Sequence, residues 1–128
     1  MKRLPHKSWQ KAPACIVALL AAVGTSAVFA HTLLDRSVPA ADSVVHGPPA
    51  EVKLWFSQAL EPAFSTLRVV DKNAKQVDQK DKRVDAGDAT LLRVSLHPLA
   101  PGTYRVIWRV LSADGHVSKG DFTFGVVP

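Results

Sequence analysis

An aspartate and a histidine stand two residues apart in the segment LSADGH, residues 111–116. In an extended segment, two such side chains project to the same side of the backbone, and Gly115 places no third side chain between them. A carboxylate oxygen of Asp114 and an imidazole nitrogen of His116 held in this way can bind a metal ion. The alternative is an Asp-Gly turn with an exposed histidine beside it, because Asp-Gly alone is a common turn signal.

The first thirty residues predict a secretory signal peptide, which decides where the exported protein begins. Basic residues precede an apolar run over 12–23, and Val28-Phe29-Ala30 fits the small-residue pattern of a cleavage site. The apolar run is shorter than the roughly 20 residues that a membrane-spanning helix needs, which argues against an uncleaved anchor. We therefore expect a signal peptide over residues 1–30, cleavage after Ala30, and a periplasmic protein.

Cleavage after Ala30 would make His31 the first residue of the mature chain. A free N-terminal histidine offers its α-amine and its ring Nδ1 to one metal ion, which closes a six-membered chelate ring. Together with the imidazole of His116 and the carboxylate of Asp114, this makes three nitrogens and one oxygen. Cu(II) favours such a set in a tetragonal arrangement, whereas Zn(II) accepts the same ligands in a tetrahedral one. The predicted metal ligands are His31, Asp114 and His116, which would bind one Cu(II) per chain.

Residues 31–128 contain no sulfur ligand, because the one cysteine, Cys15, and the one methionine, Met1, precede the cleavage site. Thiolates and thioethers are the soft donors that select Cu(I) and form blue-copper sites, so the sequence argues against both. The remaining histidines of this region, His46 and His97, lie in segments rich in turn residues. We expect neither of them to bind the metal.

Composition predicts one exported domain and argues against nucleic-acid binding. The whole chain has a formal net charge of +5, but four of its basic residues precede Ala30. Residues 31–128 keep 12 basic and 11 acidic residues, a net charge of +1, and this offers little attraction for a phosphate backbone. A region of this length suits one domain with a modest core that is held together without disulfides.

Alternating apolar and polar residues predict strands throughout this region. The clearest runs cover residues 51–56, 66–70, 91–96, 104–110 and 122–126, and turn signals rich in Pro, Gly and Asp separate them. Residues 71–90 mix charges of both signs, so we expect a solvated connection there, with one short edge strand at Gln76–Val84. The prediction is an all-β fold, a small Ig-like or cupredoxin-like Greek-key β-sandwich over residues 31–128.

Several motifs of the chain resemble the CopC family of periplasmic copper-binding proteins, and together they cover residues 31–128. They are His31 followed by Ser37-x-Pro39-Ala40, then Val52-x-Leu54-x-Phe56-Ser57, Pro101-x-x-Tyr104-x-Val106-x-Trp108-Arg109-x-x-Ser112-x-Asp114-Gly115-His116, and Gly120-x-Phe122-x-Phe124. The resemblance implies a β-sandwich whose high-affinity Cu(II) site consists of the α-amine and ring of His31 with Asp114 and His116.

The resemblance also implies a membrane partner, and it covers only one of the two kinds of copper site found in the family. The partner is a CopD-type integral membrane protein, with a role in copper uptake or tolerance. Some members of the family also have a methionine-rich loop that binds Cu(I). Since no methionine occurs after Met1, this chain resembles the members that have a Cu(II) site only.

Three functions compete at this point. The first is a monomeric periplasmic Cu(II)-binding protein that is not an enzyme and acts in copper homeostasis or resistance. The second is a histidine-brace copper oxidoreductase of the polysaccharide monooxygenase type. It is disfavoured because Asp114 would occupy a copper position and because Tyr104 and Trp108 lie on a face that we expect to be buried. The third is a metal-free Ig-like accessory domain whose histidines are incidental.

Overall fold

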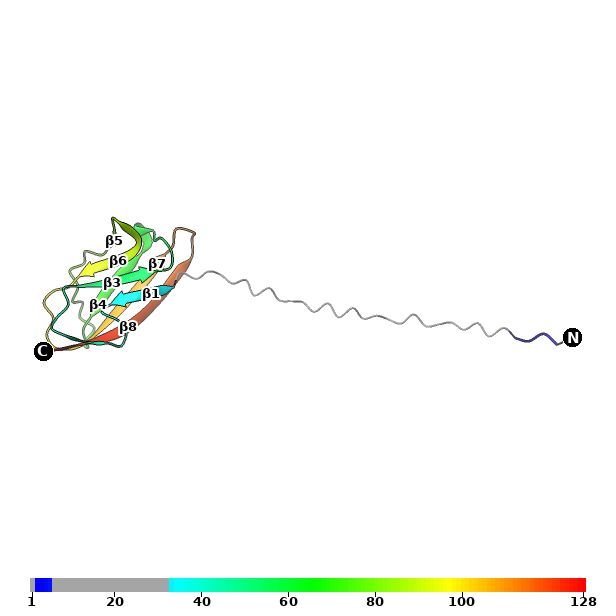
Figure 1. Cartoon of the computed structure of the whole chain (residues 1–128), viewed down its shortest axis with the longest axis horizontal. Helices are drawn as coiled ribbons and strands as arrows, with labels where there is room; N and C mark the ends of the chain where they lie inside the picture. The colour runs from blue at the N-terminus through cyan, green and yellow to red at the C-terminus, as the bar shows by residue number, and fades with distance from the viewer. Residues whose placement is uncertain (1, 6–32) are drawn as a thin grey trace.

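The computed structural model describes residues 2–5 and 33–128, and the part from residue 33 onward forms two packed β-sheets (Figure 1). The elements of this part are β1 (Leu34–Val38), β2 (Val44–His46), β3 (Glu51–Phe56), a single turn of 3-10 helix η1 (Pro62–Phe64), β4 (Thr66–Val70), β5 (Arg83–Asp85), β6 (Asp88–Ser95), β7 (Gly102–Leu111) and β8 (Val117–Val127). Within the described residues, no helix is long and apolar enough to cross a membrane.

The strand order shows that the chain crosses repeatedly between the sheets. One sheet has the order β1-β3-β6-β5 and the other the order β2-β8-β7-β4. All pairings are antiparallel except that of β2 with β8. Most neighbours in a sheet are therefore not consecutive in the chain, which is typical of Greek-key sandwiches. The predicted all-β sandwich is confirmed.

The five predicted runs all form strands, whereas the first two strands were missed. In β1 the residues are mostly exposed, and in β2 there are only three residues, none of them fully buried. Neither strand therefore carries the apolar alternation that marks a half-buried strand in a sequence. Both are held mainly by backbone pairing, β1 with β3 and β2 with β8.

The connection after β4 differs from its prediction. The expected edge strand at Gln76–Val84 is wrong in its bounds, since the regular strand β5 covers only Arg83–Asp85. The segment is also not wholly solvated, because Asp78 is only 2% exposed. The Asp78 carboxylate accepts hydrogen bonds from the backbone amides of Val69, at 2.8 Å, and Lys80, at 2.9 Å. A buried carboxylate satisfied in this way fixes the connection against β4.

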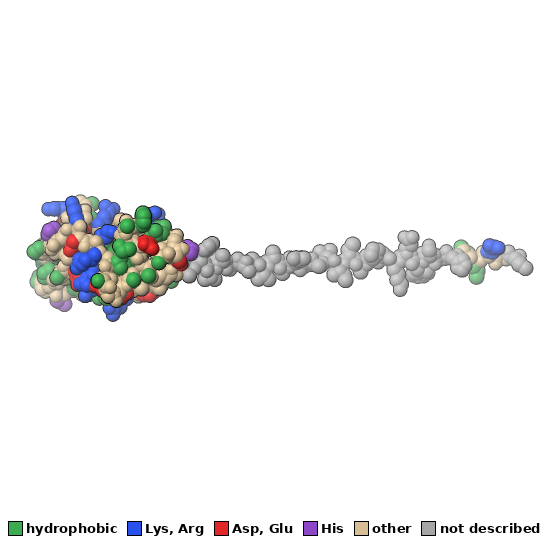
Figure 2. Space-filling view, turned by 90° about the horizontal axis from the view of Figure 1, so that it is seen from above, with side chains coloured by type: hydrophobic (Ala, Val, Ile, Leu, Met, Phe, Trp, Pro, Cys, Tyr) green, Lys and Arg blue, Asp and Glu red, His purple; other side chains and the backbone are tan. Residues whose placement is uncertain are grey.

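The core lies between the sheets and consists of the inward residues of each alternating strand. Those that are fully or nearly fully enclosed include Val52, Leu54 and Phe56 of β3, Leu92 and Val94 of β6, Val106 and Val110 of β7, and Phe124 of β8. On the surface of the sandwich, basic and acidic side chains lie next to one another on the face drawn in Figure 2. One core of this kind is what a region of this length can build.

Three aromatic rings pack together at the end of the core where β3 ends. Trp108 lies edge-on to Phe56, with ring centroids 6.3 Å apart, and tilted against Phe122 at 5.9 Å. The indole covers Gly120, its partner on β8. A Cβ atom added at Gly120 would lie 2.4 Å from Cζ2 of Trp108. Glycine is therefore required at this position because the ring occupies the space of a side chain.

Replacing Gly120 with alanine is expected to lower the free energy of unfolding by about 1–3 kcal/mol, because the indole must leave its packed position. Chemical denaturation measures this loss. Gly125→Ala is the matched control on the same strand, since its added Cβ would meet Val44 at an ordinary 3.4 Å. Equal destabilisation by the two substitutions would contradict the packing argument.

Candidate metal centre

The loop between β7 and β8, residues 112–116, is closed by its own hydrogen bonds. The amide of Ser112 donates to the carbonyl of His116 at 2.9 Å, and the amide of Gly115 donates to the carbonyl of Ser112 at 2.9 Å. Gly115 has a φ of +90°, which glycine adopts without the steric penalty that a Cβ atom brings. The loop thus has a defined shape, and the two strands that flank it are paired along their whole length.

Asp114 and His116 meet in this loop, as their spacing predicted. Oδ2 of Asp114 lies 3.1 Å from Nδ1 of His116, and the two side chains are 43% and 41% exposed. Two ligand atoms that each lie about 2.0–2.2 Å from a shared ion are about 3 Å apart from one another. The pair therefore has a separation that two adjacent ligands of one ion could have, and the Nδ1 atom itself is enclosed.

Two further side chains orient the Asp114 carboxylate. The buried hydroxyl of Ser112 donates to its Oδ1. The Gln58 amide, oriented with its nitrogen toward the carboxylate, donates to Oδ2 at 2.8 Å and to Oδ1 at 3.2 Å. Ser112 belongs to the sequence motif, but nothing in the sequence pointed to Gln58, which comes from the segment after β3. Side chains that hold a ligand in place in this way commonly set its affinity for metal.

The same contacts change the acidity of Asp114. The hydrogen bond from Ser112, with that of His116 second in importance, holds the pKa of Asp114 below its ordinary value. Hydrogen bonds to the ionised form favour that form. The carboxylate is therefore kept ionised, which is the state in which it can bind a cation.

The first residue of the described domain lies close to this loop. The amide of Leu33 donates to Oγ of Ser57 at 2.9 Å, and the amide of Ser57 returns a bond to the carbonyl of Leu33 at 2.9 Å. Two residues further on, the carbonyl of Ala59 accepts from the amide of Ala113 at 2.9 Å. One short segment after β3 thus touches both the start of the domain and the Asp114 loop, which lie at the same end of the sandwich (Figure 1).

Two of the other histidines, His46 and His97, do not join the Asp114 loop. His31 lies outside the described residues. His46 is exposed on β2, with its Nδ1 3.4 Å from the carbonyl of Pro128, and His97 is exposed in the turn after β6. Both are at the end of the sandwich opposite the Asp114 loop, as the strand pairings require. Among the described residues, no group of three or more His, Cys, Asp and Glu side chains comes together to hold a metal ion.

The fold and the site define a small all-β protein, a two-sheet sandwich that pairs a carboxylate and an imidazole, two groups able to bind metal ions, on one hairpin loop. The chain belongs to the CopC family, because the model of the CopC domain matches residues 34–127. Members of this family are copper-binding resistance proteins and not enzymes. The resemblance seen in the sequence motifs is confirmed.

Individual relatives support this assignment. Protein YobA of Escherichia coli (strain K12) is 36% identical over 103 residues, which are 80% of this chain and 83% of that protein. Copper resistance protein C of Xanthomonas campestris pv. juglandis is 31% identical over 117 residues, 87% of this chain and 91% of its own. Copper transport protein CutJ of Bacillus subtilis (strain 168) is 29% identical over 77% of this chain but only 18% of its own length.

Two solved structures share the fold. CopC from Methylosinus trichosporium OB3b has a TM-score of 0.68 and 35% identity, covering 77% of this chain and 95% of that one. PcoC, a methionine-rich copper resistance protein from Escherichia coli, has a TM-score of 0.67 and 35% identity, covering 77% of this chain and 100% of that one. The alignment thus spans the whole of the solved PcoC chain.

Replacing Ser112 with alanine is expected to raise the pKa of Asp114 toward its ordinary value, because the largest cause of its lowering is removed. A lowered pKa in the folded state stabilises the fold above the pKa of the unfolded chain, and this contribution is lost as pH falls through the lowered value. The Ser112→Ala variant should therefore lose less of its folding stability than the parent protein as pH falls through this range. A pH titration monitored by the Asp114 carboxyl ¹³C shift measures the change.

The matched control is Ser118→Ala on β8, whose hydroxyl makes no hydrogen bond with Asp114 in the described part of the chain. An unchanged Asp114 pKa in Ser112→Ala, or an equal shift in Ser118→Ala, would show that Ser112 does not hold the carboxylate.

Proposed function

We propose that this protein is a periplasmic Cu(II)-binding protein of copper homeostasis and resistance. It binds one Cu(II) through the α-amine and ring of His31, the carboxylate of Asp114 and the imidazole of His116. The observation that supports this most strongly is the Asp114–His116 pair, with Oδ2 and Nδ1 3.1 Å apart, on the loop beside the first described residue of the domain.

Chain length supports a meeting of His31 with this pair. Leu33 and Ser57 exchange two hydrogen bonds, one donated by the amide of each residue. Gln58, which follows Ser57, donates a hydrogen bond to the Asp114 carboxylate. Two residues of extended chain span at most about 7 Å. These contacts put the start of the described domain at the end of the sandwich that carries Asp114, which supports a short path from His31 to the pair.

The donor set favours Cu(II) over other metal ions. Nitrogen-rich sets with one oxygen suit Cu(II), which also has the highest affinity among the divalent first-row ions. No cysteine or methionine occurs in the sequence after Cys15, so the soft ligands that select Cu(I) are missing from residues 31–128. The site should bind and release copper without changing its oxidation state.

The residues around the pair would prepare it for binding and release. Ser112 and Gln58 hold the carboxylate in one orientation and keep it ionised. The α-amine and the two imidazoles must lose protons before they bind, so copper affinity falls in acid. Both described ligand residues lie on a surface loop, with side chains more than two-fifths exposed.

The destination of the copper is a further part of the proposal. We propose that the protein sequesters Cu(II) as a monomer and delivers it to an integral membrane partner of the CopD type. Support comes from CutJ, a copper transport protein in which the segment similar to this chain is a small part of a longer sequence. A segment similar to this chain therefore occurs within a longer copper transport protein.

The proposal is tested by adding one residue in front of His31. The extension leaves every side chain in place but moves the free α-amine away from the His31 ring, so the chelate is lost. We expect a tight one-to-one Cu(II) complex for the protein that begins at His31. The extended protein should bind Cu(II) at least about 100-fold more weakly, a larger loss of affinity than follows from removing a side chain that only orients a ligand. Competition titration with a Cu(II) chelator measures both constants, and equal affinities would exclude the amine as a ligand.

Substitution of single ligands gives a second prediction. His116→Gln should lower Cu(II) affinity by at least about 100-fold, whereas Asp114→Asn should lower it by about 10–100-fold because its charge is lost but an oxygen remains. His46→Gln is the matched control, since this residue is exposed at the opposite end of the sandwich. Loss of affinity in the control, or none in His116→Gln, would contradict the assignment.

A further inference from the structure

The outer face of the second sheet carries four long basic side chains. They are Arg68 on β4, Arg105 and Arg109 on β7, and Lys119 on β8, and all are exposed. Strand pairing places them on one side, because Arg68 lies opposite Ile107 and Arg109 lies opposite Lys119. We call these four residues, with Ile107 at their centre, the basic face.

Little negative charge offsets this face. Asp121, on β8, is the one acidic residue paired between its strands, and it is bonded to Arg105. For Arg68, Arg109 and Lys119, no ion pair forms with any described residue. Near the far edge, Oδ1 of Asp71 accepts hydrogen bonds from the backbone amides of Asn73 and Lys75 in its own turn. The four basic residues and Asp121 together give the basic face a net charge of about +3, and three of its cations form no ion pair with a described residue.

The outer face of the other sheet is different. There Glu51 bonds Arg93 and Lys53, at 2.8 Å and 3.2 Å, and Asp85 bonds Arg93 at 2.8 Å. Arg83 lies 3.2 Å from Asp81. Lys53, Arg83 and Arg93 are therefore paired with carboxylates, while Arg36 lies over the ring of Trp55 at 3.8 Å, so fewer unpaired cations remain there than on the basic face.

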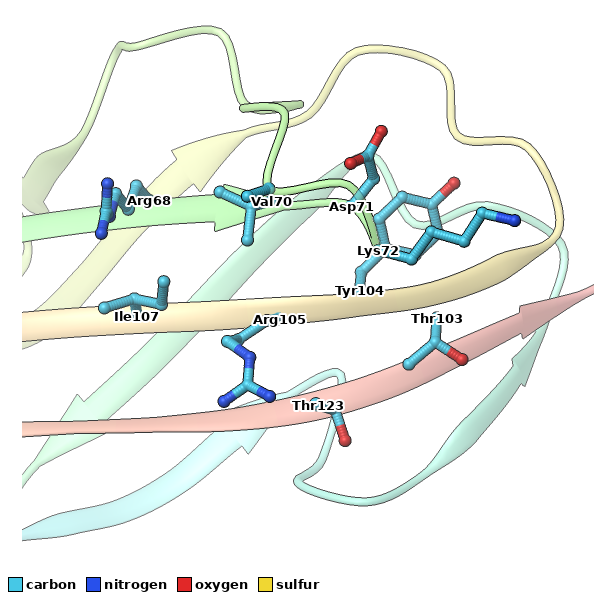
Figure 3. Close-up of a pocket in the computed structure, with 10 residues that line it drawn as sticks. Arg68, Val70, Asp71, Lys72, Thr103, Tyr104, Arg105, Ile107 and Thr123 are labelled. Atoms are coloured by element: carbon cyan, nitrogen blue, oxygen red, sulfur yellow. The ribbon is translucent and has the colours of Figure 1, made fainter.

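A shallow cleft of about 320 Å³ at one edge of the basic face offers hydrogen-bond donors for an anion (Figure 3). Arg68, Arg105 and Lys72 line it together with the hydroxyl groups of Thr103 and Thr123, and the carboxylate of Asp71 is the one acidic group in this lining. Guanidinium, ammonium and hydroxyl groups together suit phosphate oxygens, to which arginine can donate two parallel hydrogen bonds.

Exposed apolar side chains lie at the opposite edge of the face, beside the Asp114 loop. Val117, the first residue of β8, is 48% exposed and stands opposite Leu111 on the outer side. Phe64, just before β4, is 64% exposed. Basic residues combined with exposed apolar ones are typical of surfaces that bind the interface of a membrane.

We propose that the basic face docks on the surface of a membrane containing anionic phospholipids. Its cations are spread across three strands and are not aligned along a groove, which suits a continuous charged surface better than one extended peptide. A phosphate headgroup would occupy the cleft near Arg105, and Val117 and Phe64 would enter the interfacial layer. This orientation brings the Asp114 loop to the membrane surface. The inference does not depend on copper.

Sedimentation with phospholipid vesicles tests the proposal on the metal-free protein that begins at His31. At low salt, the protein should bind vesicles of phosphatidylglycerol and phosphatidylcholine, should not bind pure phosphatidylcholine, and should dissociate as salt is added. Each cation near an anionic surface strengthens binding about fivefold. The triple variant Arg68→Gln, Arg109→Gln, Lys119→Gln should therefore bind about 100-fold more weakly.

The control is the triple variant Arg36→Gln, Lys53→Gln, Arg83→Gln, which removes the same charge from the outer face of the other sheet. It should bind anionic vesicles nearly as well as the parent protein, with folding of both variants checked by circular dichroism. Failure of the parent protein to bind anionic vesicles, or equal losses in the two variants, would overturn the proposal. So would retention on immobilised polyglutamate without vesicle binding, which would indicate an acidic protein partner.

Discussion

The hydrogen-bonded loop between β7 and β8 is the constraint on which the functional end of this molecule depends. Its two strands form a ladder that is continuous from Gly102 opposite Val126 to Leu111 opposite Val117. At the top of this ladder, Ser112 and Gly115 close a turn whose geometry leaves Asp114 and His116 on one side. A carboxylate and an imidazole on such a loop are held in place before any ion arrives, so binding need not order them at that moment.

The loop is fixed from the other sheet as well as from its own. The segment after β3 bonds Leu33 through Ser57, Asp114 through Gln58 and Ala113 through Ala59. Three parts of the chain that are far apart in sequence therefore converge at one end of the sandwich. Since the two sheets pack around a shared core, the fold itself brings the start of the domain to the loop. This convergence gives an N-terminal histidine a structural reason to be a ligand.

Local pattern in the sequence predicted most strands of the fold, whereas features that depend on tertiary contact were missed. The strands rich in alternation, such as β3 and β7, were predicted because each buries nearly every second residue. In contrast, β1 and β2 were missed because they are held by backbone pairing and expose most of their side chains. Asp78 was taken for part of a solvated connection, yet it is buried, because the backbone amides that satisfy it become its neighbours only in the folded chain.

The same division applies to the candidate site. The pairing of Asp114 with His116 was predicted from a spacing of two residues, which is a local property. Gln58 had no signal in the sequence, because its role depends on the segment after β3 lying against the β7–β8 loop. The role of His31 was inferred from a cleavage site and a family resemblance, and the proposed copper site depends on it more than on any other residue.

Pulsed EPR of the Cu(II)-loaded protein that begins at His31 tests this role most directly. The modulation from the remote imidazole nitrogens reports how many histidine rings bind the ion, and ¹⁵N-labelled histidine identifies their signals. We predict two rings on one copper, reduced to one by His116→Gln and unchanged by His46→Gln. A single ring in the parent protein, or two rings that persist in His116→Gln, would show that His31 and His116 do not share a metal ion.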